Sequence, residues 1–190
     1  MIKKLLLMMA FSVFIVSAFS QNRNTALLVI DIQDFYFPGG DVPLVNPEDA
    51  AENAFTLINS FREKEFPVIF VRHNYEPGGS VNDIVLPLKD EKIITKSEIN
   101  SFKGTDLDSY LKSLGIKDLV ICGMQTHMCV EAATRAAYDL GYTCTVIDDA
   151  CTTRDLKYGD RIIKAEDVHY STLSSLRSYA KILTTREYLK

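Results

Sequence analysis

The sequence predicts an α/β fold: a three-layer αβα arrangement around a doubly wound, six-stranded, mostly parallel sheet. Short apolar runs typical of buried strands alternate along the chain with longer segments whose apolar residues recur at helical spacing. This alternation favours a parallel sheet with helices on both faces. The length of 190 residues fits one domain, two at most, and a hydrophobic fraction of 47% supplies a core of ordinary size.

Six apolar runs are predicted to be the strands of this sheet. They are largely continuous rather than alternating, as expected for strands that are buried on both faces. The first run ends near an acid, Asp31, and the fourth ends at Gly123. In chain order the runs cover residues 25–32, 67–71, 92–95, 118–122, 142–147 and 180–183.

Helices are predicted between the strands. The first begins at Pro47, where proline suits the first turn and Asn46 supplies the cap. The last contains a stretch near residues 167–171 that predicts a division into two helices. The predicted helices cover residues 47–61, 106–115, 126–140 and 162–179.

The first twenty residues have the features of a secretory signal peptide. Lys3 and Lys4 precede an apolar run, and the small residues Ser17 to Ser20 come just before Gln21. The apolar run is short for a membrane-spanning helix, so we favour cleavage over the alternative of an uncleaved anchor. We therefore predict a signal peptide over residues 1–20, a mature domain over residues 21–190, and a periplasmic or secreted location.

Charge and cysteine content exclude several classes of partner. The net charge is −4 without a basic cluster, so we predict no nucleic acid partner, and no membrane partner after signal cleavage. Cys122, Cys129, Cys144 and Cys151 have neither CxxC nor zinc-site spacing. An oxidising compartment permits three disulfide pairings, but we expect all four thiols to be free in the working protein.

Three reactive side chains are predicted to meet at one edge of the sheet. Asp31 lies at the end of the first predicted strand, Lys96 at the end of the third, and Cys129 in the first turn of the helix after the fourth. Right-handed crossovers place the carboxyl ends of all parallel strands at the same edge, where ligands bind. The sequence therefore predicts a site built from an acid, a lysine and a cysteine.

These three residues suit nucleophilic attack on a carbonyl carbon. The helix N-terminus and Lys96 favour a thiolate at Cys129, and Asp31 can take and return a proton. The backbone N–H groups of Gln125 and Cys129 are candidates for an oxyanion hole. His127 is only two residues from Cys129, so their side chains diverge on a helix. Asp31 and Lys96 are therefore better partners for the thiol.

The chain resembles the isochorismatase-like cysteine hydrolase superfamily, which includes nicotinamidases and N-carbamoylsarcosine amidohydrolases. The resemblance implies a six-stranded parallel sheet, a catalytic triad of Asp31, Lys96 and Cys129, and a cis peptide near Met124 and Gln125. The motifs that carry it are LVIDIQD at 28–34, Thr95-Lys96 with Phe102 and Thr105 downstream, CGMQTHMCVEA at 122–132, DDAC at 148–151 and HYSTL at 169–173.

One motif of the nicotinamidases is missing. Those enzymes carry an Asp-x-His pair and a further histidine that bind a metal, whereas the corresponding stretch here, residues 71–76, has His73 alone. We therefore predict no metal and no other cofactor, and consider nicotinamidase activity less favoured. Phe35, Tyr36 and Phe102 are candidates for lining the substrate pocket, although aromatic residues more often pack in the core.

The predicted function is hydrolysis of an amide-type C–N bond in a small molecule through a covalent acyl-enzyme. Two alternatives stay open: a ligand-binding or thiol-redox protein on the same scaffold, and isochorismatase-type hydrolysis of a vinyl ether. The predicted partner is a small-molecule substrate, and the resemblance leaves room for a homo-oligomer. Specificity is expected to depend on the loops at residues 35–43 and 73–90.

Overall fold

A computed structural model describes residues 24–190 of the chain. The predicted signal peptide, residues 1–20, lies outside the described residues, so cleavage and secretion stay predictions. Over residues 24–190, no helix combines the length and the hydrophobicity needed to cross a bilayer.

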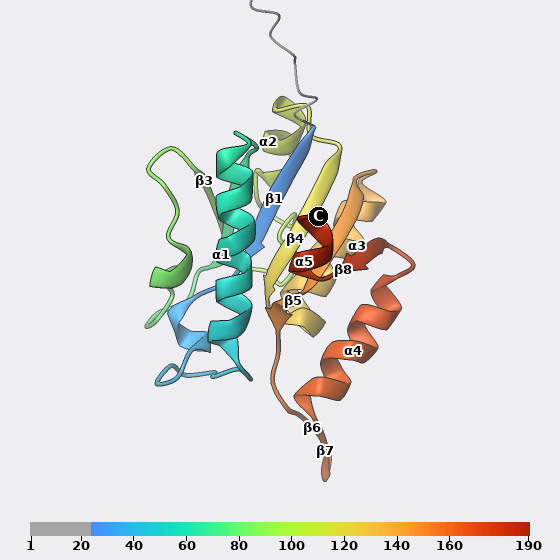
Figure 1. The fold of residues 1–190 in the computed structure, drawn as a ribbon. Helices are drawn as coiled ribbons and strands as arrows, with labels where there is room; N and C mark the ends of the chain where they lie inside the picture. Colours follow the sequence, from blue (N-terminus) through green and yellow to red (C-terminus); the bar gives the residue numbers. More distant parts are fainter. Residues whose placement is uncertain (1–23) are drawn as a thin grey trace, which may run out of the picture.

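The predicted α/β fold is confirmed, and the main sheet is parallel throughout (Figure 1). Its strand order is β3-β2-β1-β4-β5-β8, which places β1 and β4 at the centre. The chain therefore winds outwards from β1 in both directions, and the switch point lies between β1 and β4. The strands are β1 Thr25–Ile30, β2 Val68–His73, β3 Lys92–Lys96, β4 Asp118–Met124, β5 Thr143–Thr152 and β8 Ala180–Leu183.

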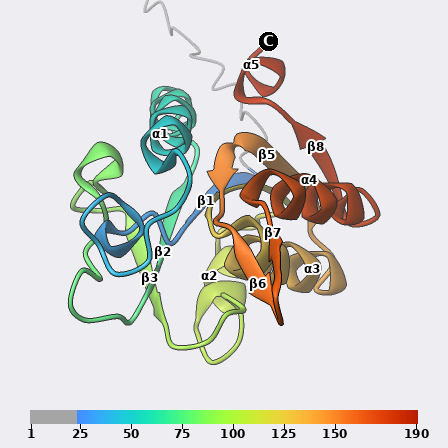
Figure 2. The same cartoon turned by 90° about the horizontal axis from the view of Figure 1, so that it is seen from below.

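Helices cover both faces of the sheet (Figure 2). On one face lie α1, Pro47–Glu63, and α5, Thr185–Tyr188; on the other lie α2, Leu107–Ser113, α3, Glu131–Asp139, and α4, Ala165–Leu176. The long helix α1 buries an apolar stripe against the sheet. Its buried members are Ala50, Ala51, Ala54, Leu57, Ile58 and Phe61.

A helix is confirmed within residues 162–179, but its predicted start and its predicted interior break were both wrong. Residues 156–163 form an antiparallel hairpin of β6, Leu156–Tyr158, and β7, Arg161–Ile163, which projects from the body (Figure 1). Helix α4 then runs without a break. The hydroxyl of Thr172 donates to the carbonyl of Val168 over 2.8 Å, so the polar residues near the expected break are satisfied inside the helix.

Strand β5 is longer than predicted because it continues through an irregularity. Its register against β4 shifts between Ile121 and Gly123, and after the shift Gly123 pairs with Cys151. The side chain of Asp149 accepts hydrogen bonds from the amide and hydroxyl of Thr185, the first residue of α5. That short helix was missed, although its capping box of Thr184 and Glu187 is readable in the sequence.

The two central strands approach each other most closely at the edge that carries the reactive residues. Ile30 is the register partner of Gly123, whose φ is +125°. A Cβ atom at residue 123 would lie 2.0 Å from the carbonyl oxygen of Ile30. Only glycine fits this contact, and it sets the spacing between Asp31 and the segment that leads to Cys129.

We predict that Gly123→Ala lowers the free energy of unfolding by about 3 kcal/mol, because backbone strain adds to overpacking against Ile30. Urea denaturation measures the change. Gly141→Ala is the matched control: its φ is also positive, +93°, but its Cβ would meet no atom within 4 Å. The control should lose only about 1 kcal/mol, and equal losses in the two variants would refute the steric explanation.

Candidate active site

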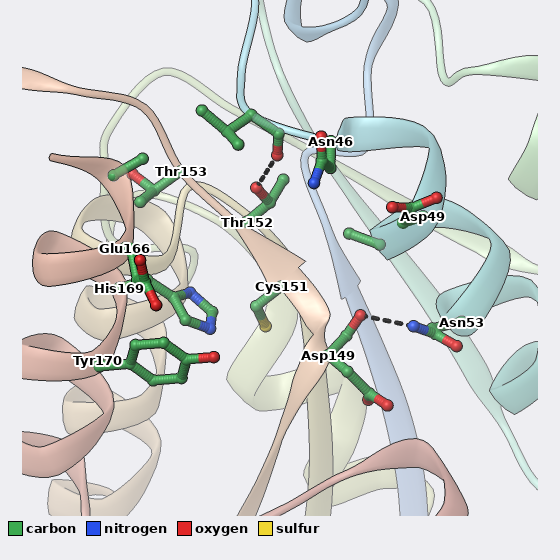
Figure 3. Close-up of a pocket in the computed structure, with 13 residues that line it drawn as sticks. Asn46, Asp49, Asn53, Asp149, Cys151, Thr152, Thr153, Glu166, His169 and Tyr170 are labelled. Carbon is green, nitrogen blue, oxygen red and sulfur yellow. Dashed lines mark hydrogen bonds between the residues drawn. The ribbon is translucent and has the colours of Figure 1, made fainter.

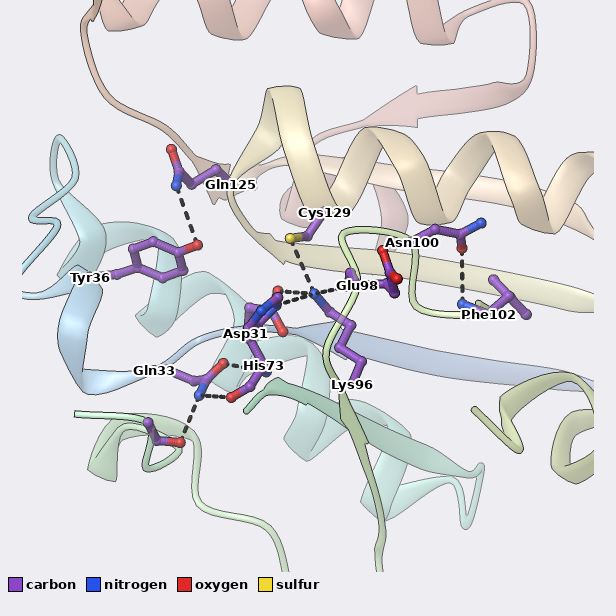
Figure 4. Close-up of polar contacts among 11 residues, drawn as sticks. Asp31, Gln33, Tyr36, His73, Lys96, Glu98, Asn100, Phe102, Gln125 and Cys129 are labelled. Atoms are coloured by element: carbon purple, nitrogen blue, oxygen red, sulfur yellow. Dashed lines mark hydrogen bonds and ion pairs between the residues drawn. The ribbon is translucent and has the colours of Figure 1, made fainter. Parts of the chain in front are cut away.

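Asp31, Lys96 and Cys129 meet at the carboxyl edge of the sheet, as the sequence predicted (Figure 4). The ammonium nitrogen of Lys96 lies 2.8 Å from Oδ2 of Asp31 and 3.2 Å from Sγ of Cys129. The side chains of Asp31 and Lys96 have no exposed surface, and Cys129 is 4% exposed. Residues that are 33 to 98 positions apart in the chain thus form one buried cluster of an anion, a cation and a thiol.

Lys96 directs its three N–H groups towards three acceptors other than the carboxylate. These acceptors are Sγ of Cys129 at 3.2 Å, Nδ1 of His73 at 3.2 Å and the carbonyl oxygen of Glu98 at 3.1 Å. Over the described residues, neither oxygen of Asp31 receives a well-aligned hydrogen bond. Lys96 therefore holds Asp31 by charge, and the carboxylate keeps free lone pairs with which it can accept a proton.

Burial controls the protonation of both reactive groups. Burial raises the pKa of the Asp31 carboxyl, and the nearby Lys96 ammonium opposes this shift. Burial and then the charge of Asp31 raise the pKa of the Cys129 thiol to about 12, against the opposing effect of Lys96. Lys96 thus favours the thiolate, as expected, but desolvation outweighs its effect, so the neutral thiol is the resting form of Cys129.

Cys129 lies in a π-helical turn, Thr126–Val130, which joins β4 to α3. The carbonyl oxygen of Gln125 accepts hydrogen bonds from the amides of Met128 and Val130, at 3.0 and 3.3 Å. The peptide between Met124 and Gln125 is cis, as the resemblance implied. The turn brings the sulfur of Cys129 back over the end of the sheet, where Lys96 reaches it.

A hydrogen-bonded network beside the cluster joins the two candidates Gln125 and Tyr36 to Arg154, a residue that the sequence analysis missed. The side-chain amide of Gln125 donates to the hydroxyl of Tyr36 over 3.3 Å, and Nε of Arg154 donates to the amide oxygen of Gln125 over 3.2 Å. Tyr36 is buried, whereas Arg154 is exposed. Arg154 follows the carboxyl end of β5, so the strand-end argument would have found it if β5 had been given its full length.

The other two aromatic candidates lie in different surroundings. The ring of Phe35 packs against Tyr36 and Tyr75, at centroid distances of 4.1 and 4.4 Å. Phe102 stacks on Tyr142 at 6.2 Å, and in Figure 4 it lies apart from the triad. Of the three aromatic candidates, Tyr36 is the one whose polar atom joins the network of Gln125.

Two clefts lie near the site without including the triad in their walls. One, of about 450 Å³, is lined by Phe35 and by parts of the loops that were expected to carry specificity. The other, of about 430 Å³, lies between α1, the end of β5 and α4 (Figure 3). From its wall, His169 contacts the hydroxyl of Thr126 through Nδ1 at 2.9 Å, so this cleft borders the turn that carries Cys129.

The residues around the cluster do not fit a resident metal ion. Asp31, His73 and Cys129 each offer one donor atom, and these atoms lie within 4.8 Å of one another. Oxygen, nitrogen and sulfur donors would suit zinc. However, the Lys96 ammonium already lies 2.8 to 3.2 Å from all three donors, so a cation of the protein's own occupies the place between them.

Comparisons with known proteins agree with this geometry. The model of the isochorismatase domain matches residues 25–187. The uncharacterized isochorismatase family protein YddQ of Bacillus subtilis is 44% identical, over 88% of this chain and 99% of its own length. Nicotinamidase 3 of Arabidopsis thaliana is 25% identical, over 82% of this chain and 81% of its own.

A solved structure, that of an isochorismatase hydrolase from Oleispira antarctica, is 40% identical with a TM-score of 0.85, and the match covers 89% of this chain and 97% of that one. This chain therefore belongs to the isochorismatase family of hydrolases.

The charges of the two partners should move the pKa of Cys129 in opposite directions. Asp31→Asn removes an anion next to the sulfur and should lower the pKa of Cys129 by about one unit or more, whereas Lys96→Met should raise it. The pH dependence of alkylation at Cys129, read by peptide mass spectrometry, measures the shift. Cys144, whose raised pKa has no charged cause, is the internal control. A shift of the same sign in both variants would contradict this electrostatic account.

Proposed function

We propose that this chain is a cysteine hydrolase that cleaves an amide-type C–N bond of a small molecule through an acyl-enzyme. The observation that carries the proposal is the buried contact of Lys96 with both Asp31 and Cys129. The carboxylate of Asp31 receives no aligned hydrogen bond from the described residues, so it can accept the proton of the Cys129 thiol. Nicotinamidase 3 is a relative that is named for hydrolysis of an amide, which favours this bond class.

In the proposed first step, the sulfur of Cys129 attacks the carbonyl carbon while its proton passes to Asp31. Because the pKa of the thiol is raised to about 12 and that of Asp31 is also raised, attack and proton transfer proceed together. Lys96 stabilises the negative charge that develops on the sulfur. The amides of Gln125 and Cys129 are the proposed donors to the oxyanion, an interaction whose loss typically costs about 10²–10³ in kcat.

In the proposed second step, the tetrahedral species collapses and its C–N bond breaks. Asp31 returns the proton to the departing nitrogen, which leaves a thioester on Cys129. A water molecule then gives a proton to Asp31 and attacks the thioester carbon. The C–S bond breaks, the acid leaves, and Asp31 returns the proton to the sulfur, so that the cycle closes with one water consumed.

We further propose that the substrate carries an anionic group. Arg154 is the exposed cation that joins the site through Gln125, and Gln125 also contacts the hydroxyl of Tyr36. Burial raises the pKa of the Tyr36 hydroxyl, so this group is neutral and can donate a hydrogen bond. A guanidinium at the mouth of a buried site favours carboxylate or phosphate.

Two other functions fit the site less well. A thiol-redox role needs a thiolate, but the pKa of Cys129 is raised. Hydrolysis of a vinyl ether needs no sulfur nucleophile, whereas here the sulfur of Cys129 contacts the only ammonium that lies against Asp31 among residues 24–190. Attack on a carbonyl carbon, by contrast, gives a role to each of Asp31, Lys96 and Cys129.

A release assay over small amides, ureides and carbamoyl compounds tests the proposal, with each anionic compound matched by a neutral analogue. Cys129→Ala should lower turnover by about 10³-fold or more and abolish the acyl adduct in intact-mass spectra, because no nucleophile is left. Arg154→Gln should raise KM for the anionic compounds alone. Arg161→Gln, in the projecting hairpin, is the matched control. Turnover retained by Cys129→Ala would remove the mechanism.

A further inference from the structure

Lys96 must reach across a neighbouring strand to act. It ends β3, the edge strand, whereas Asp31 follows β1, two strands away in the order β3-β2-β1. Strands are spaced by about 4.8 Å, so β3 and β1 lie about 10 Å apart, and the lysine side chain has to extend across the end of β2 to meet the carboxylate of Asp31. An unsupported lysine side chain has many rotamers. A group that contacts the Lys96 side chain has to restrict it to the rotamer that reaches the sulfur of Cys129.

His73 is the residue that contacts the Lys96 side chain in this way. It ends β2 and is the direct register partner of Lys96 in the parallel pair of β2 and β3. Its Nδ1 lies 3.2 Å from the ammonium nitrogen of Lys96. Because an ammonium can only donate, Nδ1 must accept, and the ring must be the neutral form with its proton on Nε2. The imidazole thus takes one of the three N–H groups of Lys96.

The backbone of His73 is itself held in place. Gln33, which has no exposed surface, accepts a hydrogen bond from the amide of His73 over 2.7 Å. The side-chain amide of Gln33 donates to the carbonyl oxygens of His73, at 3.0 Å, and Gly79, at 2.6 Å. These hydrogen bonds fix the backbone from which the imidazole projects. A residue that orients another side chain requires such a fixed backbone.

We propose that His73 is the positioning residue for Lys96: its neutral imidazole aims the ammonium at Cys129 and Asp31, and its protonation releases the ammonium. The proposal rests on the function proposed above, in which Lys96 stabilises the attacking sulfur. It assigns His73 a role in the proposed reaction without contact to the substrate. It also explains how a partly exposed histidine can control a cluster that is itself buried.

The charges around His73 give the sign of its pH dependence. Burial and the ammonium of Lys96 lower the pKa of His73, whereas Asp31 and Glu98 oppose the shift, and the thiol of Cys129 is uncharged. His73 is therefore neutral at neutral pH. Below its pKa, which lies under the ordinary value of 6.5, the ring becomes a second cation beside Lys96 and can no longer accept its proton.

Alkylation of Cys129 as a function of pH, in the full chain, tests the proposal without a substrate. His73→Leu removes the acceptor and should slow alkylation about tenfold or more at neutral pH, because Lys96 no longer supports the sulfur. His73→Asn supplies an amide oxygen near the place of Nδ1 but does not titrate. It should restore most of the rate and abolish the additional loss of reactivity that the wild type shows in acid.

Arg72→Gln is the matched control. Arg72 precedes His73 on β2, pairs with Thr95 on the same two strands and projects to the opposite face. Its alkylation profile should equal that of the wild type, and circular dichroism verifies the fold of each variant. An unchanged rate in His73→Leu, or an acid loss that persists in His73→Asn, would overturn the proposal.

An NMR titration of His73 supplies a readout that is independent of the thiol. Lys96→Met should raise the pKa of His73, because it removes a cation that contacts the ring. An unchanged pKa would overturn the contact on which the proposal depends. Turnover is measured separately. If the panel of amides gives no turnover while alkylation depends on His73 as described, the proposed function fails and the positioning role stands.

Discussion

The buried pair of Asp31 and Lys96 is the interaction on which the rest of the site depends. Two fully buried charges cost several kcal/mol each in desolvation, and removing one partner of such a pair typically costs about 3–5 kcal/mol. Three further contacts offset part of this cost, because His73, the carbonyl of Glu98 and the sulfur of Cys129 all lie within hydrogen-bond distance of the one ammonium. The same contacts hold the two buried charges next to the thiol of Cys129, where they can take part in its chemistry.

The pair also decides when the thiol reacts. A resting thiolate would be alkylated or oxidised by many compounds, whereas a thiol with a pKa of about 12 reacts much more slowly with them. The buried oxygens of Asp31 have no aligned hydrogen-bond donor among the described residues, and the pKa of Asp31 is raised, so this carboxylate can both accept the proton and give it back. Burial therefore limits reactivity towards other compounds and at the same time prepares the acid–base group.

The sequence predicted the fold well wherever one apolar run corresponds to one strand. It failed where tertiary contacts override local patterns. The irregular continuation of β5 depends on its pairing with β4, and the projecting hairpin at residues 156–163 has no strong strand pattern of its own. The expected break in α4 is absent because hydroxyl groups bond inside the helix. None of these contacts is readable from propensity alone.

The triad was predictable because the carboxyl ends of parallel strands meet at one edge, and the family resemblance pointed to the same three residues. Its electrostatics were not predictable, since the degree of burial at Cys129 reversed the expected shift of its pKa. His73 was visible only as a lone histidine. Its contact with Lys96 follows from the register of β2 against β3, which a single sequence does not specify.

A double-mutant cycle on kcat/KM with Asp31→Asn, Lys96→Met and the double variant tests the central claim most directly. If the pair acts as one unit, the double variant should lose about as much activity as either single variant, as catalytic groups that work together do. If the losses multiply, Asp31 and Lys96 act independently, and the account of a single buried cluster is contradicted.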